Sequence, residues 1–190
     1  SLPFIEAIRQ LRNQIGSLRT CFLHVTLLPY IKTAGELKTK PTQHSVKELQ
    51  GMGIQPDILL CRTENFIPDE QKSKIALFCN IKSDSVIEAL DCDSIYQVPI
   101  SYHKQGLDEQ ICSFFNLNVD KKPDLSRWIN INKIEAASEG IINIGVVCKY
   151  TAMIDAYKSL IEAINHGGIF NKVKVKIKWI DSETLEDKEM

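Results

Sequence analysis

Short apolar runs recur along the chain and predict the strands of a parallel sheet. Residues 21–28, 57–61, 85–90 and 141–148 are each rich in apolar side chains and bounded by turn residues. The first run is apolar almost throughout, so we expect it to be buried on both faces of the sheet. Residues 172–179 instead alternate lysine with apolar residues, which predicts a strand with one solvated face.

Apolar residues at helical spacing lie between these strands. They predict helices over residues 1–15, 41–52, 69–78, 107–115 and 156–165. The first helix is expected to pack one face inward, and Gly167 and Gly168 are expected to end the last one. Alternating strands and helices predict βαβ units and an α/β fold.

A polar segment divides this pattern in two. Residues 117–140 are polar, include Lys121-Lys122-Pro123-Asp124 and show no sustained period, which predicts a linker between domains. The first domain then covers residues 1–116. A second, incomplete one covers 141–190 and ends in an acidic helical start from Asp181 to Met190.

The overall charge excludes strong attraction to polyanions. The chain has 23 basic and 24 acidic residues and a formal net charge of −1, so neither nucleic acid nor an anionic membrane is an expected partner. No apolar run approaches the roughly 18 residues that cross a bilayer, and the first residues lack a signal-peptide pattern. A cytoplasmic protein is expected.

The six cysteines are scattered and form no C-x-x-C pair. This spacing favours neither a zinc site nor a disulfide framework. We therefore expect reduced, mostly buried thiols that pack as small hydrophobic groups. No metal ligand and no catalytic residue is assigned from the sequence.

A basic loop before the second helix is the strongest chemical feature. Lys38-Thr39-Lys40-Pro41-Thr42-Gln43 places two ammonium groups and several polar side chains at a helix start. Such a start offers free backbone N–H groups and the positive end of the helix dipole, which favours an anion. From the residues alone, a solvated basic loop and a phosphate site remain equally open.

The surrounding run, residues 35–49, resembles the uridine nucleotide loop of the cytidine triphosphate (CTP) synthase family. Further matches lie, in order, at residues 1–10, 53–57, 74–79, 93–96 and 155–159. The resemblance implies an internal segment of a glutamine-hydrolysing enzyme. It would span the C-terminal part of a Rossmann-like synthetase (amidoligase) domain, a linker, and the first elements of a flavodoxin-like class I glutamine amidotransferase domain.

The family aminates uridine triphosphate (UTP) to CTP, with ATP activating the pyrimidine carbonyl and glutamine supplying ammonia. By resemblance, UTP or CTP would contact Lys38, Thr39, Lys40, Pro41, Thr42 and Gln43, with Lys74 adding a cation and Phe78 lying near. ATP would contact Arg62, Leu90, Asp91 and Cys92. Without the resemblance, Arg62 and Lys74 are expected to be surface cations.

Two residues of the first helix match positions near the family's tetramer interface. These are Glu6 and Arg9, whose spacing is equally typical of an ion pair on a solvated helix face. The resemblance also implies a homotetramer and GTP as an activator.

Several family elements find no match in the sequence. These are the glycine-rich phosphate loop, the acidic Mg²⁺ ligands and the amidotransferase nucleophile, so ATP and Mg²⁺ chemistry would need residues outside this segment, and the segment alone is expected to be inactive. Cys148 stands where the family usually has glycine, and a structural role is expected. The alternative function is a non-catalytic nucleotide-binding or regulatory module derived from the enzyme.

Overall fold

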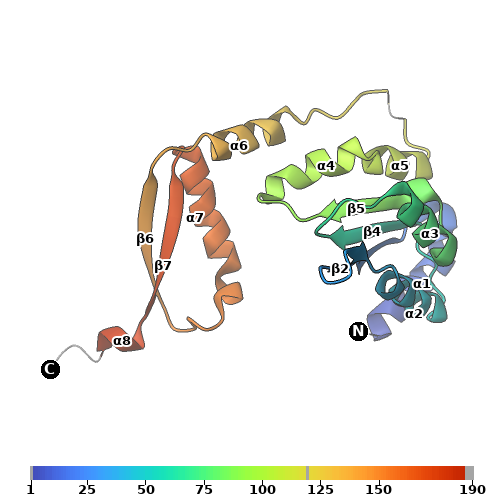
Figure 1. The fold of residues 1–190 in the computed structure, drawn as a ribbon, viewed down its shortest axis with the longest axis horizontal. Coiled ribbons are helices and arrows are strands. Elements are labelled where there is room, and N and C mark those ends of the chain that lie inside the picture. Colours follow the sequence, from blue (N-terminus) through green and yellow to red (C-terminus); the bar gives the residue numbers. More distant parts are fainter. Residues whose placement is uncertain (1, 119, 187–190) are drawn as a thin grey trace. The chain divides into compact units, whose positions relative to one another are not determined.

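The computed structural model describes residues 2–118 and 120–186, which fall into two compact units within residues 1–125 and 126–190 (Figure 1). The first unit contains α1 (Leu2–Ile15), β1 (Leu23–Leu27), β2 (Tyr30–Ile31), β3 (Glu36–Leu37), α2 (Lys40–Gly51), β4 (Ile58–Thr63), α3 (Asp69–Cys79), β5 (Val86–Leu90), α4 (Val98–Lys104) and α5 (Leu107–Phe114). Short 3-10 helices cover Ser17–Arg19, Ser83–Ser85 and Ile95–Gln97. The predicted α/β fold is confirmed, although Ser1 lies outside the described residues.

The core of the first unit is a parallel sheet in the order β1-β4-β5. Strand β4 is central and buries side chains on both faces. Leu59 and Cys61 join the core under α2 and α3, while Ile58 and Leu60 pack with Leu107 of α5 on the opposite face. Helices therefore cover both faces of β4, as the continuous apolar run predicts.

Strand β1 differs from its prediction. Leu23, Val25 and Leu27 are 37%, 56% and 62% exposed, so the expectation of burial on both faces is wrong. In this sheet β1 is an end strand. Within the described residues, α4 and α5 pack on β4 and β5 and leave this face of β1 open.

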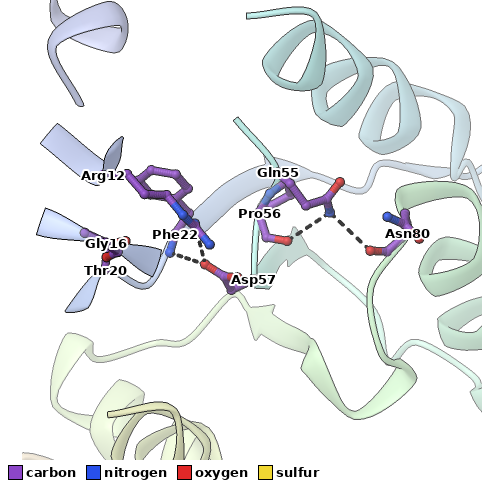
Figure 2. Close-up of polar contacts among 8 residues, drawn as sticks. All are labelled: Arg12, Gly16, Thr20, Phe22, Gln55, Pro56, Asp57 and Asn80. Atoms are coloured by element: carbon purple, nitrogen blue, oxygen red, sulfur yellow. Dashed lines mark hydrogen bonds and ion pairs between the residues drawn. The ribbon is translucent and has the colours of Figure 1, made fainter. Parts of the chain in front are cut away.

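Helix α1 also differs, because it contains no buried residue. Phe4, Ile8 and Leu11 are 76%, 48% and 50% exposed, so the predicted inward face is not packed in this structure. Polar contacts hold the helix instead. Arg12 donates to Asp57 Oδ2 at 3.1 Å, and its guanidinium lies 4.5 Å from the centroid of the Phe22 ring (Figure 2).

Asp57 and Gln55 connect the chain segments at the amino-terminal edge of the sheet. The same Asp57 oxygen accepts the Phe22 backbone N–H at 2.7 Å. Gln55 Nε2 donates to the backbone oxygens of Pro56 and Asn80, at 3.0 and 3.1 Å (Figure 2). These contacts satisfy backbone groups of loops that would otherwise be exposed to water or unpaired.

Helix α2 is attached to β1 by a buried contact. Val46 and Leu28 are both fully buried in one core cluster. The Thr42 hydroxyl, also fully buried, donates to the Leu27 carbonyl at 2.9 Å, and His24 Nε2 lies 2.8 Å from Ser45 Oγ. Apolar and polar contacts therefore fix the first turns of α2 against the end of β1.

The second unit contains α6 (Ser126–Ala136), β6 (Ile141–Cys148), α7 (Lys158–Phe170), β7 (Lys174–Asp181) and α8 (Glu183–Glu186), with a 3-10 turn at Ile154–Tyr157. Helix α6 lies inside the segment 117–140, where the polar sequence showed no helical period. Strands β6 and β7 pair in parallel, with Ile144 opposite Ile177. Residues 187–190 of the predicted final helix lie outside the described residues.

Gly167 and Gly168 lie inside α7, so the prediction that they end this helix is wrong. A Cβ atom on Gly168 would lie 2.6 Å from Val175 Cγ2 and 3.0 Å from the Val173 carbonyl oxygen. The missing side chain lets α7 approach β7 closely, so this glycine serves packing. On β7, the lysines at 174, 176 and 178 are exposed between half-buried apolar residues, which confirms the predicted solvated face.

The six cysteines are all unpaired, and Cys61, Cys79 and Cys148 are buried. Within the described residues, no helix combines the length and apolarity that crossing a bilayer requires. No cluster of three or more His, Cys, Asp or Glu side chains forms a metal site in this part of the chain.

We expect Cys61 and Cys79 to resist alkylation in the native protein. Burial raises the pKa of Cys61 to about 12 and that of Cys79 to about 11, and the thiolate is the reactive form. Peptide mass spectrometry after iodoacetamide treatment at pH 8 should find the half-buried Cys92 and Cys112 labelled before Cys61 and Cys79. Labelling of Cys61 at the rate of Cys112 without denaturant would contradict this structure.

We expect Thr42→Val to lower the free energy of unfolding by about 1 kcal/mol, because the substitution keeps the volume and removes a buried hydrogen bond. Urea denaturation measures the change. The matched control is Thr20→Val, whose hydroxyl donates to the Gly16 carbonyl at the exposed surface and whose loss should cost less than about 0.5 kcal/mol. Equal losses of unfolding free energy at both positions would show that the buried Thr42 hydrogen bond contributes no more than the exposed one of Thr20.

Candidate functional site

The basic loop at residues 38–43 connects β3 to α2. The β2–β3 hairpin pairs Ile31 with Glu36, and the Lys38 N–H then donates to the Pro29 carbonyl at 2.9 Å. Thr39 precedes the first helical residue, Lys40, and Pro41 follows in the first turn, where a missing N–H costs no helical hydrogen bond. Hairpin and proline together fix where α2 begins.

Several predicted contact residues of this loop use their side chains within the protein. Thr42 donates to Leu27, and Gln43 Nε2 donates to the hydroxyl of Thr39 at 3.1 Å, with Thr39 only 5% exposed. A ligand at the start of α2 would therefore meet backbone N–H groups and lysine side chains. Lys40 is exposed at the first helical residue.

Glu36 forms an ion pair with one of the predicted cations, and a second cation acts on it through its charge. Lys38 Nζ forms an ion pair with Glu36 Oε1, and the side chains are 45% and 56% exposed. The hydrogen bond and the charge of Lys38 lower the pKa of Glu36, and the charge of Lys74 on α3 lowers it further. Lys74 therefore lies near enough to act on the same anion as Lys38.

Phe78 lies one helical turn after Lys74 on α3, and this spacing places both side chains on one face of the helix. Its side chain is 50% exposed. An apolar ring on the same helix face as Lys74 suits a ligand with both a flat ring and negative charge.

The second group of predicted residues lies at the carboxyl ends of the sheet strands. A pocket of about 520 Å³ is lined there by Val25, Thr26, Leu27, Leu28, Pro29, Tyr30, Arg62, Thr63, Glu64 and Asp91. Arg62 Nη2 lies 2.6 Å from Asp91 Oδ1, with both side chains more than half exposed. Leu90 ends β5, and the thiol of Cys92 donates to its carbonyl at 3.3 Å. Ligands of open parallel sheets bind at this edge.

The pocket and the basic loop share one stretch of backbone. Leu27 and Pro29 line the pocket, while their carbonyls accept hydrogen bonds from Thr42 and from the Lys38 N–H. The two candidate ligand sites are therefore adjacent, separated by a single chain segment.

A larger cavity, of about 650 Å³, opens at the opposite edge of the sheet, beside Asp57, Ser85 and Glu109. The side chains of Asp57 and Gln55 in its wall are already engaged in the hydrogen bonds of Figure 2. The edge at the amino ends of the strands thus carries structural connections, and the pocket at the carboxyl edge contains the predicted residues Arg62 and Asp91.

Glu6 and Arg9, predicted either to pair or to lie at an interface, form a bidentate ion pair. Arg9 Nε and Nη2 donate to the two Glu6 oxygens at 2.8 and 2.7 Å, and Gln10 adds a third hydrogen bond. The hydrogen bond from Arg9 is the main reason that the pKa of Glu6 falls to about 2. The ion pair is therefore present, and the interface role stays a prediction.

Sequence reasoning missed Glu36 and Tyr30. Glu36 stands two residues before Lys38, a spacing that places both side chains on the same side of an extended chain. This spacing was the available signal. Nothing in the sequence indicated that Tyr30 lines the pocket at the strand ends.

The sequence is similar to known proteins over nearly its whole length. A family model described as "CTP synthase N-terminus" matches residues 1–117. The chain is 63% identical over 186 residues to a CTP synthase of Rhodospirillum centenum and 60% identical over 187 residues to one of Azospirillum brasilense. A CTP synthase of Caulobacter vibrioides is 57% identical over 188 residues.

These matches cover 98% to 99% of the chain, and the chain spans 34% of the length of each of the three relatives. The family model alone covers more than half of the sequence. The chain belongs to the CTP synthase family.

Proposed function

We propose that this chain contributes the triphosphate-binding part of the UTP and CTP site, and part of the ATP pocket, to an enzyme that aminates UTP to CTP. The ion pair of Lys38 with Glu36 just before α2, on which the charge of Lys74 also acts, carries the proposal. The two ammonium groups come from different elements and act on the same anion beside a helix N-terminus, an arrangement suited to a polyphosphate.

The chemistry assigned to these residues is binding and orientation. Lys38, Lys40 and Lys74 would neutralise the phosphates, and the N–H groups at the start of α2 would donate to phosphate oxygens. Phe78 would lie beside the nucleotide on the α3 face. ATP would activate the pyrimidine carbonyl and glutamine would supply the ammonia, both with the help of residues outside this segment.

The pocket at the strand ends is the proposed ATP site. Arg62 offers a planar guanidinium at its mouth, which can stack on or donate to a base. Asp91 holds this guanidinium by the 2.6 Å contact, so its charge is partly neutralised before a ligand arrives. Leu90 and Cys92 would contribute through their backbone.

We further assign residues 1–116 to the C-terminal part of the synthetase domain, 117–140 to the linker and 141–190 to the start of the glutamine amidotransferase domain. The end of the family-model match at residue 117 and the parallel β6–β7 pair with α7 support this division. Mg²⁺, activation by GTP, a homotetramer joined near Glu6 and Arg9, and a cytoplasmic location belong to the same proposal.

Lys38→Ala and Lys74→Ala should each weaken UTP binding about tenfold, equivalent to ~1.4 kcal/mol, because each removes one ammonium from the phosphates. Titration calorimetry on the protein at its natural length measures the dissociation constant. Lys47→Ala is the matched control, because Lys47 is an exposed lysine on α2 beyond the loop. Equal affinities in all three variants would contradict the proposed site.

Arg62→Ala should weaken ATP binding about fivefold and leave UTP binding within twofold of the unsubstituted protein, because Arg62 lines the strand-end pocket and not the loop. Arg19→Ala, an exposed arginine before β1, is the matched control. A loss of UTP affinity as large as that for ATP would contradict the separation of the two sites.

A further inference from the structure

The carboxylate between the predicted triphosphate lysines has no role in the site so far. Glu36 lies on β3, opposite Ile31 in the β2–β3 hairpin, and pairs with Lys38. Both side chains are about half exposed, so a ligand can reach the ammonium group and water can reach the carboxylate. Such open ion pairs are weak and exchange readily.

The field around Glu36 matches that expected for a phosphate oxygen. Lys38 lowers the pKa of Glu36 through a hydrogen bond and through its charge, and Lys74 lowers it from a second element. The carboxylate therefore stays ionised at neutral pH in the position where the two cations favour negative charge. An incoming triphosphate would need the same two lysines, and the Glu36 carboxylate would repel its phosphates.

We propose that Glu36 sets the affinity of the triphosphate site. In the free protein its carboxylate pairs with Lys38, and this ion pair must break when a nucleotide binds. Glu36 therefore weakens nucleotide binding. The inference rests on the proposed function and adds a residue that weakens the proposed nucleotide binding. Glu36 is thus an internal competitor for the phosphates, held in place by the hairpin that precedes α2.

The proposal predicts that Glu36→Gln tightens binding. Glutamine keeps the size and an accepting oxygen but removes the charge that competes with phosphate. In the protein at its natural length, the dissociation constant of UTP should fall three- to tenfold. The gain should be smaller than twofold for uridine monophosphate, because fewer phosphate charges meet Glu36.

Glu48→Gln is the matched control. Glu48 is an exposed α2 residue whose Oε1 lies 3.7 Å from His44 Nε2, so the substitution removes the same charge from the surface of α2 outside the loop. Its effect on UTP binding should stay below twofold. Denaturation midpoints of both variants show whether either substitution changes stability instead of affinity.

The background variant Lys38→Gln separates the two proposals. If UTP binds and substitution of either Lys38 or Lys74 weakens its binding, the proposed function stands. Glu36→Gln should then raise UTP affinity less than twofold in the Lys38→Gln background. If the function stands, three results would overturn the role of Glu36. Glu36→Gln alone could raise UTP affinity less than twofold, could lower it, or could raise the affinity for uridine monophosphate by the same factor. If UTP does not bind, or if neither lysine matters, the proposed function itself fails.

Discussion

The buried contact between α2 and β1 is the constraint on which the candidate site depends. Val46 and Leu28 are removed from water together, and the Thr42 hydroxyl satisfies the Leu27 carbonyl beside them. Burial of each aliphatic side chain contributes on the order of 1.5–3 kcal/mol, far more than the surface ion pairs nearby. The apolar contact therefore holds α2 against the end of β1, and the charged loop before α2 is positioned with it. An exposed loop without this support would not hold its lysines beside those of another helix.

The charges at the site are arranged so that they do not destabilise the free protein. Lys38 and Lys74 repel each other when they approach, and Glu36 offsets that repulsion in the absence of a ligand. If phosphates bind at these lysines as proposed, the same carboxylate would compete with them for Lys38.

The sequence predicted the fold well where burial is two-sided and poorly where it depends on partners or on close approach. Strand β4 reads as continuously apolar and is covered on both faces. Strand β1 reads the same way, but its outward face lacks a covering helix within the described residues, and no pattern in one strand reveals what packs on it. Gly168 looked like a helix end because glycine serves both purposes. Only the structure, in which a Cβ atom on Gly168 would lie 2.6 Å from Val175 Cγ2, shows that close packing is its role here.

The resemblance named the candidate site residues, but the sequence did not give their geometry. Lys38 and Lys74 lie 36 positions apart in the sequence, and only the two-residue spacing of Glu36 and Lys38 indicated that Glu36 pairs there. Their meeting depends on the parallel register that sets α2 and α3 side by side on one face of the sheet. The same register leaves Leu27 and Pro29 as a common wall, with their carbonyls bonded to the basic loop and their other atoms lining the strand-end pocket. Because that wall belongs to the packed end of the sheet, the separation of the two candidate sites is set by the core of the first unit.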